Sequence, residues 1–334
     1  MSTTPAPGYR HHALLYGSPD QLVDAAVPFL ADGLAAGEMV VLTCRPEHNA
    51  RLAAALGGGD RVLLLENEGI YLRIADAVAT YRRLVRQQTA AGIPRVRLVG
   101  EVRFDDSPQS WTEWTRYEAI CNVALGPLPL SSVCAYDTRD LPAPMRRGVE
   151  QTHPALLTAA GRMPNASYLA PEDILRRAAP DLVPLPATPA TVHLAALTNT
   201  GQLAGARARL RLALGLTTRY EALSADFLTA AAEVISNALR HGRPPVDVRL
   251  WTTPTRLVCA VTDRGNGFDD PLAGYVPYDD DHTRAGLWLA RRSCDSLDYV
   301  ATPEGFAARL TTDLPAPDHH TRRRSGPRER RGGK

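Results

Sequence analysis

Short apolar runs alternate with helix-like stretches through the first part of the chain, from Tyr9 to about Leu141. The runs are bounded by glycine, proline or charged residues and have the length and composition of buried parallel strands; they cover residues 12–17, 39–44, 61–66, 95–102 and 131–137. The stretches between them carry serine, proline or glycine at their ends, as helices do; they cover residues 18–37, 46–57 and 70–92. This alternation predicts an N-terminal α/β domain with a mostly parallel sheet and helices on both faces.

The pattern changes after residue 160, where proline becomes dense and only the short segment "PEDILRRAA" has helical spacing. We predict a semi-extended linker over residues 161–190. The elements that follow predict an α+β domain over residues 191–315: a strand at 192–198, helices at 202–215 and 224–239, two strands within 245–265, a helix at 286–297 and a strand at 306–314.

Length, charge and hydropathy narrow the class of protein. A chain of 334 residues can bury two separate cores. Its net charge of +2 gives no sign of DNA binding, and its apolar stretches are too short or too interrupted to cross a bilayer. The first ten residues lack the pattern of a signal peptide, so we expect a cytoplasmic protein without membrane contact. We expect residues 1–8 to be flexible and the basic residues 316–334 to form a disordered, solvated tail.

The cysteines are scattered along the chain without a close pair: Cys44, Cys121, Cys134, Cys259 and Cys294. An odd number without CxxC spacing argues against a disulfide framework and against a zinc site. Because buried thiols behave as small apolar groups, we expect these side chains to be part of the cores.

A stripe of polar residues interrupts the apolar segment "EVISNALRHG". Glu233, Asn237 and His241 follow one another at steps of four, which places them one above another on a helix. A solvated helix face would explain this stripe, and so would a surface that faces a ligand.

Glycines follow a strand and open a helix further along. In "VCAVTDRGNGFDD" the strand ends at Asp263, and Gly265 and Gly267 allow a tight turn and the close approach of a ligand. An ordinary hairpin turn would use the same residues. In "HTRAGLWLARRSCD" Gly286 opens a helix whose first amides could face a phosphate, and Arg284 could add a charge-assisted contact.

Taken in order, these three segments resemble the N box, G1 box and G2 box of the GHKL ATPase family, and within it the anti-sigma-factor serine kinases. The resemblance covers residues 192–314. It implies a C-terminal α+β sandwich of the GHKL ATPase type that binds ATP and Mg²⁺.

The resemblance also implies a role for each residue. Asn237 would bind Mg²⁺ through its side-chain oxygen, a ligand suited to a hard cation. Glu233 would orient or deprotonate the attacking hydroxyl group. Asp263 would accept a hydrogen bond from adenine, and Gly265 and Gly267 would make room for the base. The phosphates would contact the amides of Gly286 and Leu287 together with Arg284 and His241, although a capping or surface role for His241 is an equal alternative.

The N-terminal segment that begins "RHHALLYGSPDQLVD" is similar to the MEDS sensory domain, over residues 9–160. This resemblance implies a sensor, with a small-molecule ligand as one class of signal. The order of elements is also similar to that of RecA-like ATPases, but "YGSPDQLVD" lacks the GK[ST] sequence of a phosphate-binding loop. His12 and Tyr16 could line a ligand pocket, and packing in the core or at a sheet edge is the interpretation that we favour.

Together the resemblances predict a regulator of transcription. It would sequester a sigma factor and, in response to its N-terminal domain, use Mg-ATP to phosphorylate serine or threonine on an anti-anti-sigma partner of the STAS type. The class also implies a homodimer.

Other functions stay open. A non-catalytic module could bind nucleotide and act by protein binding only; Arg284, where the family usually has glycine, and the acidic residues 279–281 favour it, whereas Glu233 favours the enzyme. A small-molecule sensor could keep its C-terminal domain only as structure. A histidine kinase would carry a phosphoacceptor histidine followed by an acidic residue, but His153 is followed by Pro154.

Overall fold

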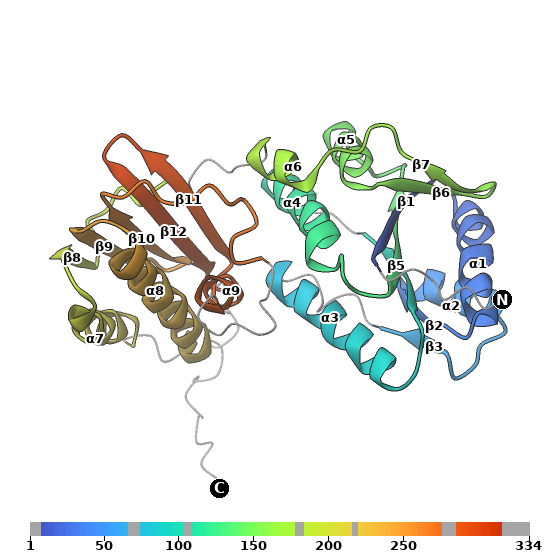
Figure 1. The fold of residues 1–334 in the computed structure, drawn as a ribbon, viewed down its shortest axis with the longest axis horizontal. Coiled ribbons are helices and arrows are strands. Elements are labelled where there is room, and N and C mark those ends of the chain that lie inside the picture. Colours follow the sequence, from blue (N-terminus) through green and yellow to red (C-terminus); the bar gives the residue numbers. More distant parts are fainter. Residues whose placement is uncertain are drawn as a thin grey trace, which may run out of the picture. The chain divides into compact units, whose positions relative to one another are not determined.

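The structure is a computed structural model, and it describes residues 8–65, 74–102, 108–177, 184–215, 220–275 and 285–315. The chain divides into two compact units, residues 1–183 with 267–292 and residues 184–266 with 293–334. Each unit contains one β-sheet, and the two are drawn in Figure 1. None of the helices in the described ranges combines the length and the apolarity that crossing a membrane requires.

The sheet of the first unit is mostly parallel. Its strands lie in the order β3-β2-β4-β5-β1-β6-β7, and only β6 and β7 pair antiparallel. The strands are β1 (Arg10–Tyr16), β2 (Met39–Thr43), β3 (Val62–Leu64), β4 (Val96–Glu101), β5 (Leu130–Asp137), β6 (Ala155–Thr158) and β7 (Gly161–Pro164).

Helices cover both faces of this sheet. They are α1 (Pro19–Ala35), α2 (Pro46–Ala55), α3 (Ile74–Ala90), α4 (Pro108–Ala124), α5 (Ala143–Thr152) and α6 (Pro171–Arg177), and α9 (Ala285–Arg292) falls in the same unit. Successive residues of a strand point to opposite faces. Val40 and Leu42 therefore lie in the core under α1 and α2, whereas Val41 lies in the core under α3 and α4. Figure 1 shows these two pairs of helices on opposite sides of the sheet.

The sheet of the second unit is entirely antiparallel, in the order β11-β12-β10-β9-β8. Its elements are β8 (Val192–Leu197), the short helix η1 (Thr200–Gln202), α7 (Leu203–Leu214), α8 (Glu221–His241), β9 (Val246–Thr252), β10 (Arg256–Asp263), β11 (Ser296–Thr302) and β12 (Gly305–Asp313). Helices α7 and α8 pack against the sheet, and α8 contacts its central strands β10, β12 and β9.

The predicted fold class is confirmed: a mostly parallel α/β domain is followed by an α+β domain of the GHKL type. The sequence analysis did not predict five of the elements, α4, α5, β6, β7 and β11. The helix predicted over residues 286–297 ends at Arg292, because Ser296 already pairs with Thr311 in the sheet. The tail beyond residue 315 and residues 1–7 lie outside the described residues.

Candidate functional site

The polar stripe of α8 lies at the edge of a well-buried helix. Val234, Ile235 and Leu239 are buried in the core, whereas Glu233 and Asn237 are half-buried and His241 is exposed. Their spacing places these three polar side chains along one line of the helix. Within the described residues, none of the three makes a side-chain hydrogen bond or an ion pair with the protein. The part of the chain that the structure describes therefore makes no claim on their polar atoms.

Asp263 ends β10 and is held by the backbone on both sides. Its Oδ1 atom accepts the N–H of Gly265 at 2.6 Å and the N–H of Arg243, just after α8, at 3.0 Å. The N–H of Arg264 donates in turn to the carbonyl oxygen of Arg243 at 2.8 Å. The side chain is 8% exposed, and no described residue donates a hydrogen bond to Oδ2. One carboxylate oxygen thus fixes the loop, and the other remains an unused acceptor.

Three glycines from three different segments surround Asp263, two against its carboxylate and one against its backbone. A Cβ atom on Gly242 would lie 2.5 Å from Cγ of Asp263, and one on Gly265 would lie 2.7 Å from Oδ1. A Cβ atom on Gly305, in the turn between β11 and β12, would lie 2.0 Å from the carbonyl oxygen of Asp263. Gly265 is therefore required by the packing of the loop, in addition to the predicted room for a base. The sequence analysis gave no role to Gly242 or Gly305. The position of Gly242 shortly after a predicted helix could have indicated one.

The remaining candidate residues follow β10 in the chain. Gly267 has φ +66°, as expected for a glycine that turns the chain after the strand. Gly286 and Leu287 lie in the first turn of α9, whose N–H groups have no partner within a helix. These three residues belong to the first compact unit, whereas Asn237 and Asp263 belong to the second. Arg284 and the acidic residues 279–281 lie outside the described residues.

A second polar centre lies at the carboxyl ends of the parallel strands in the first unit. Glu101, at the end of β4, accepts hydrogen bonds from the Tyr16 hydroxyl at 2.6 Å, from the Arg45 backbone N–H at 3.0 Å and from Nδ1 of His48 at 2.9 Å. The Arg45 guanidinium group also pairs with Glu101 and lies 3.4 Å from Asp137. Burial raises the pKa of Glu101, but the hydrogen bonds from Arg45 and Tyr16 outweigh it and hold this pKa below its ordinary value of 4.5.

His12 and Tyr16 make their polar contacts inside the protein. Tyr16 is buried and its hydroxyl group donates a hydrogen bond to Glu101. His12 is buried, with Nδ1 2.9 Å from the carbonyl oxygen of Ser132. Both side chains therefore pack within the protein, as we favoured from the sequence. The turn after β1 is closed in the same way, because Gln21 accepts the N–H of Gly17 at 2.7 Å and Ser18 caps α1.

Comparison with protein families identifies both domains. The MEDS model, described as the methanogen/methylotroph DcmR sensory domain, matches residues 10–154. The model of the histidine kinase-like ATPase domain matches residues 196–312. A comparison with curated proteins gives no match.

Two solved structures are distantly similar. The RsbU and RsbW domains of Rv1364c from Mycobacterium tuberculosis share 22% identity with a TM-score of 0.29, over 39% of this chain and 34% of that chain. The histidine kinase domain of the E. coli osmosensor EnvZ shares 17% identity with a TM-score of 0.23, over 42% of this chain and 100% of that chain. The chain thus spans about a third of the length of the mycobacterial protein, and similarity at these TM-scores carries no functional information. The family models show a chain of two domains: a MEDS sensory domain at residues 10–154 and a histidine kinase-like ATPase domain at residues 196–312.

Proposed function

We propose that this protein is a signal-responsive anti-sigma regulator whose C-terminal domain binds Mg-ATP. It sequesters a sigma factor and phosphorylates serine or threonine on a STAS-type anti-anti-sigma protein, under the control of a small-molecule signal at the MEDS domain. One observation carries the nucleotide part of this proposal. Asp263 is fixed at the end of β10 through Oδ1, while Oδ2 has no donor among the described residues. A rigid, buried acceptor of this kind suits the exocyclic amino group of adenine.

The stripe on α8 fits the other end of the nucleotide. The amide oxygen of Asn237 is a suitable ligand for Mg²⁺, and no described residue competes for it. Glu233 lies one helical turn earlier, where its carboxylate would take the proton of the attacking hydroxyl group. Bound Mg-ATP supplies the phosphoryl group and the charge that stabilises its transfer. We assign the phosphates to His241 and to the segment that contains Gly267, Arg284, Gly286 and Leu287.

The same proposal includes the organisation of the chain. We propose the sensory domain at residues 9–160, the ATPase domain at 191–315 and a linker at 161–190, in which β7 and α6 belong to the first compact unit. We also propose that the protein acts in the cytoplasm, where sigma factors bind RNA polymerase, and that it forms a homodimer without contacting DNA or membranes.

Replacing Asp263 by asparagine is expected to weaken Mg-ATP binding by at least about tenfold, the effect of losing one hydrogen bond to a charged group. Asparagine keeps an acceptor for the two loop amides and puts a donor in place of Oδ2. Calorimetric titration of the full chain with Mg-ATP measures the effect, beside Asn237→Ala. Asp226→Asn, an exposed change on α8, is the control and should bind as the parent does. Equal affinity in all four proteins would contradict this nucleotide site.

Replacing Glu233 by glutamine is expected to slow phosphoryl transfer by about 100-fold while Mg-ATP binding is retained, because glutamine cannot accept the proton. The assay is transfer of labelled phosphate from ATP to purified STAS-domain proteins of the same organism. Binding of Mg-ATP without transfer by the parent would favour the non-catalytic module. Absence of binding by the parent would leave the C-terminal domain as a structural part of a sensor.

A further inference from the structure

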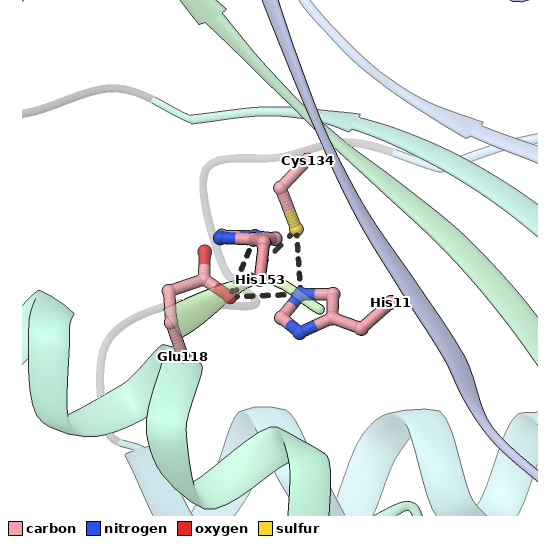
Figure 2. A group of neighbouring side chains, drawn as sticks. All are labelled: His11, Glu118, Cys134 and His153. Atoms are coloured by element: carbon pink, nitrogen blue, oxygen red, sulfur yellow. Dashed lines mark hydrogen bonds and ion pairs between the residues drawn. The ribbon is translucent and has the colours of Figure 1, made fainter. Parts of the chain in front are cut away.

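Four side chains that can ligate a metal converge inside the MEDS domain. His11 comes from β1, Glu118 from α4, Cys134 from β5, and His153 directly follows α5. Nε2 of His11 lies 3.1 Å from Oε2 of Glu118 and 3.3 Å from Sγ of Cys134. Oε2 lies 3.7 Å from Sγ and 3.7 Å from Nε2 of His153. Figure 2 shows all four pointing toward one another.

The surrounding hydrogen bonds fix the tautomers of both histidines. Nδ1 of His153 lies 2.8 Å from the carbonyl oxygen of Val149, which can only accept, so Nδ1 carries the hydrogen. Nδ1 of His11 lies 3.1 Å from Oδ1 of Asn122, whose Nδ2 already donates to two carbonyl oxygens. Nδ1 of His11 is therefore also the donor. With the hydrogen of each ring on Nδ1, both Nε2 atoms face the cluster as acceptors.

The interior of the cluster consequently holds more acceptors than protons. Oε1 of Glu118 accepts the Tyr136 hydroxyl at 2.6 Å, and Oε2 accepts the weak S–H donor of Cys134 at 3.7 Å while it faces the two imidazole lone pairs. Nε2 of His153 belongs to a side chain that is 0% exposed, and it has no hydrogen-bond partner in the part of the chain that the structure describes. An unsatisfied buried acceptor of this kind destabilises the fold. A cation at the centre would satisfy all four groups at once.

We propose that His11, Glu118, Cys134 and His153 form a binding site for a divalent transition metal ion, with Zn²⁺ as the best match. Two imidazoles, a thiolate and a carboxylate are ligands that Zn²⁺ accepts, and the two anionic ligands balance its charge in the protein interior. Binding releases the thiol proton of Cys134 to solvent, together with any proton on Glu118.

The geometry and the outer contacts agree with such an ion. Tetrahedral zinc sites place neighbouring ligand atoms about 3.3–3.8 Å apart, given their bond lengths. The four separations given above run from 3.1 to 3.7 Å, and all four ligand atoms lie within 4.8 Å of one another. Each imidazole also donates its other N–H to an oxygen, as metal-bound histidines do. A cavity of about 20 Å³ borders Glu118 and Cys134, which leaves room beside the ion for a water-sized molecule.

The alternative is a hydrogen-bonded cluster that holds protons and no metal. In that form a protonated Glu118 would donate to Nε2 of His11, 3.1 Å away. That arrangement leaves Nε2 of His153 without a donor. Both forms bury the same residues, so the test must detect the ion itself.

The test uses the purified full chain after treatment with a chelator, titrated with Co²⁺ as a spectroscopic probe and with Zn²⁺. We expect about one equivalent of Co²⁺ to bind, with thiolate-to-cobalt absorption, and Zn²⁺ to displace it and raise the melting temperature. Cys134→Ser should abolish the thiolate absorption, and His153→Gln should weaken Zn²⁺ binding by at least about 100-fold.

Two matched variants serve as controls. Cys121→Ser removes a buried thiol of α4 outside the cluster, and His12→Gln removes a buried imidazole beside it. Both should keep the cobalt spectrum and the effect of Zn²⁺ on melting. No stoichiometric binding by the parent, or an unchanged cobalt spectrum in folded Cys134→Ser, would overturn the proposal and leave the proton-holding cluster. If Cys134→Ser does not fold, the titration of His153→Gln decides in the same way.

Discussion

Replacing Gly305 by alanine is expected to lower the free energy of unfolding of the ATPase domain by about 4 kcal/mol. The new Cβ atom would lie 2.0 Å from the carbonyl oxygen of Asp263 and 2.7 Å from Cα of Arg264. Both are backbone atoms of the loop that carries the acceptor, so no side chain can move aside to make room. Gly305 also has φ +148°, a conformation that residues with a side chain rarely adopt.

Hydrogen exchange measured on peptides from β10 and β12 reports the stability of this domain separately from the MEDS domain. Gly205→Ala is the matched control, because Gly205 lies within α7 and a Cβ atom there would meet nothing within 4 Å. Alanine at that helical position should stabilise the domain by about 0.5–1 kcal/mol. If the β10 and β12 peptides of Gly305→Ala exchange at the same rate as those of the parent, Gly305 does not lie against the backbone of Asp263 as described.

Replacing Glu101 by glutamine is expected to destabilise the MEDS domain by about 3 kcal/mol, the lower end of the cost of breaking a buried ion pair. The carboxylate accepts hydrogen bonds from Tyr16, Arg45 and His48 at once. Glutamine has nearly the same volume but offers one oxygen and one N–H₂ group. The N–H₂ group would face a donor, and the positive charge of Arg45 would lose its nearest partner.

The effect of this change should depend on pH. The pKa of Glu101 is lower in the folded protein than its ordinary value of 4.5, so the unfolded chain takes up the proton first as the pH falls. The stability that the carboxylate contributes is therefore complete above that ordinary value and is lost as the pH falls through the folded value. The difference between parent and Glu101→Gln should be largest near neutral pH and should shrink in acid.

The measurement is urea unfolding at several pH values, monitored by hydrogen exchange on peptides from β1 and β4. Asp20→Asn is the control, because Asp20 pairs with Arg51 at 3.1 Å while both side chains are at least half exposed. A surface pair of this kind contributes about 0–1 kcal/mol, so its loss should have a small effect at every pH. An equal effect of the two substitutions would show that Glu101 does not hold the strand ends together.

Periodicity was sufficient to predict the central strands of both sheets, because those of the parallel sheet are continuous apolar runs and those of the antiparallel sheet alternate apolar with polar residues. It failed for α4, whose buried face carries Glu118 and is interrupted by the half-buried Asn122. These polar residues break the apolar stripe because they make hydrogen bonds inside the domain. It also failed for β11, whose outer residues Val300 and Ala301 are exposed at the sheet edge.

The candidate nucleotide site likewise contains residues that the sequence predicted and a residue that it did not. Glu233, Asn237 and Asp263 could be proposed from sequence because their motifs are local, and the family model covers them. Gly305 could not, because its role depends on which turn the topology brings against Asp263. The spacing of the cysteines likewise gave no sign of a metal site, because its ligands come from four elements that only the fold brings together.

The position of these four ligands along the chain has a consequence for biosynthesis. His11 belongs to the first strand, and His153 follows α5, near the other end of the MEDS match. Contacts between residues so distant in sequence form late, because the intervening chain must be ordered first. After β1, the ribosome still has to synthesise the five helices α1 to α5 and the strands β2 to β5 before His153 emerges. Metal uptake would then be an event of the finished domain, and a nascent chain would carry its first histidine unpartnered until that moment.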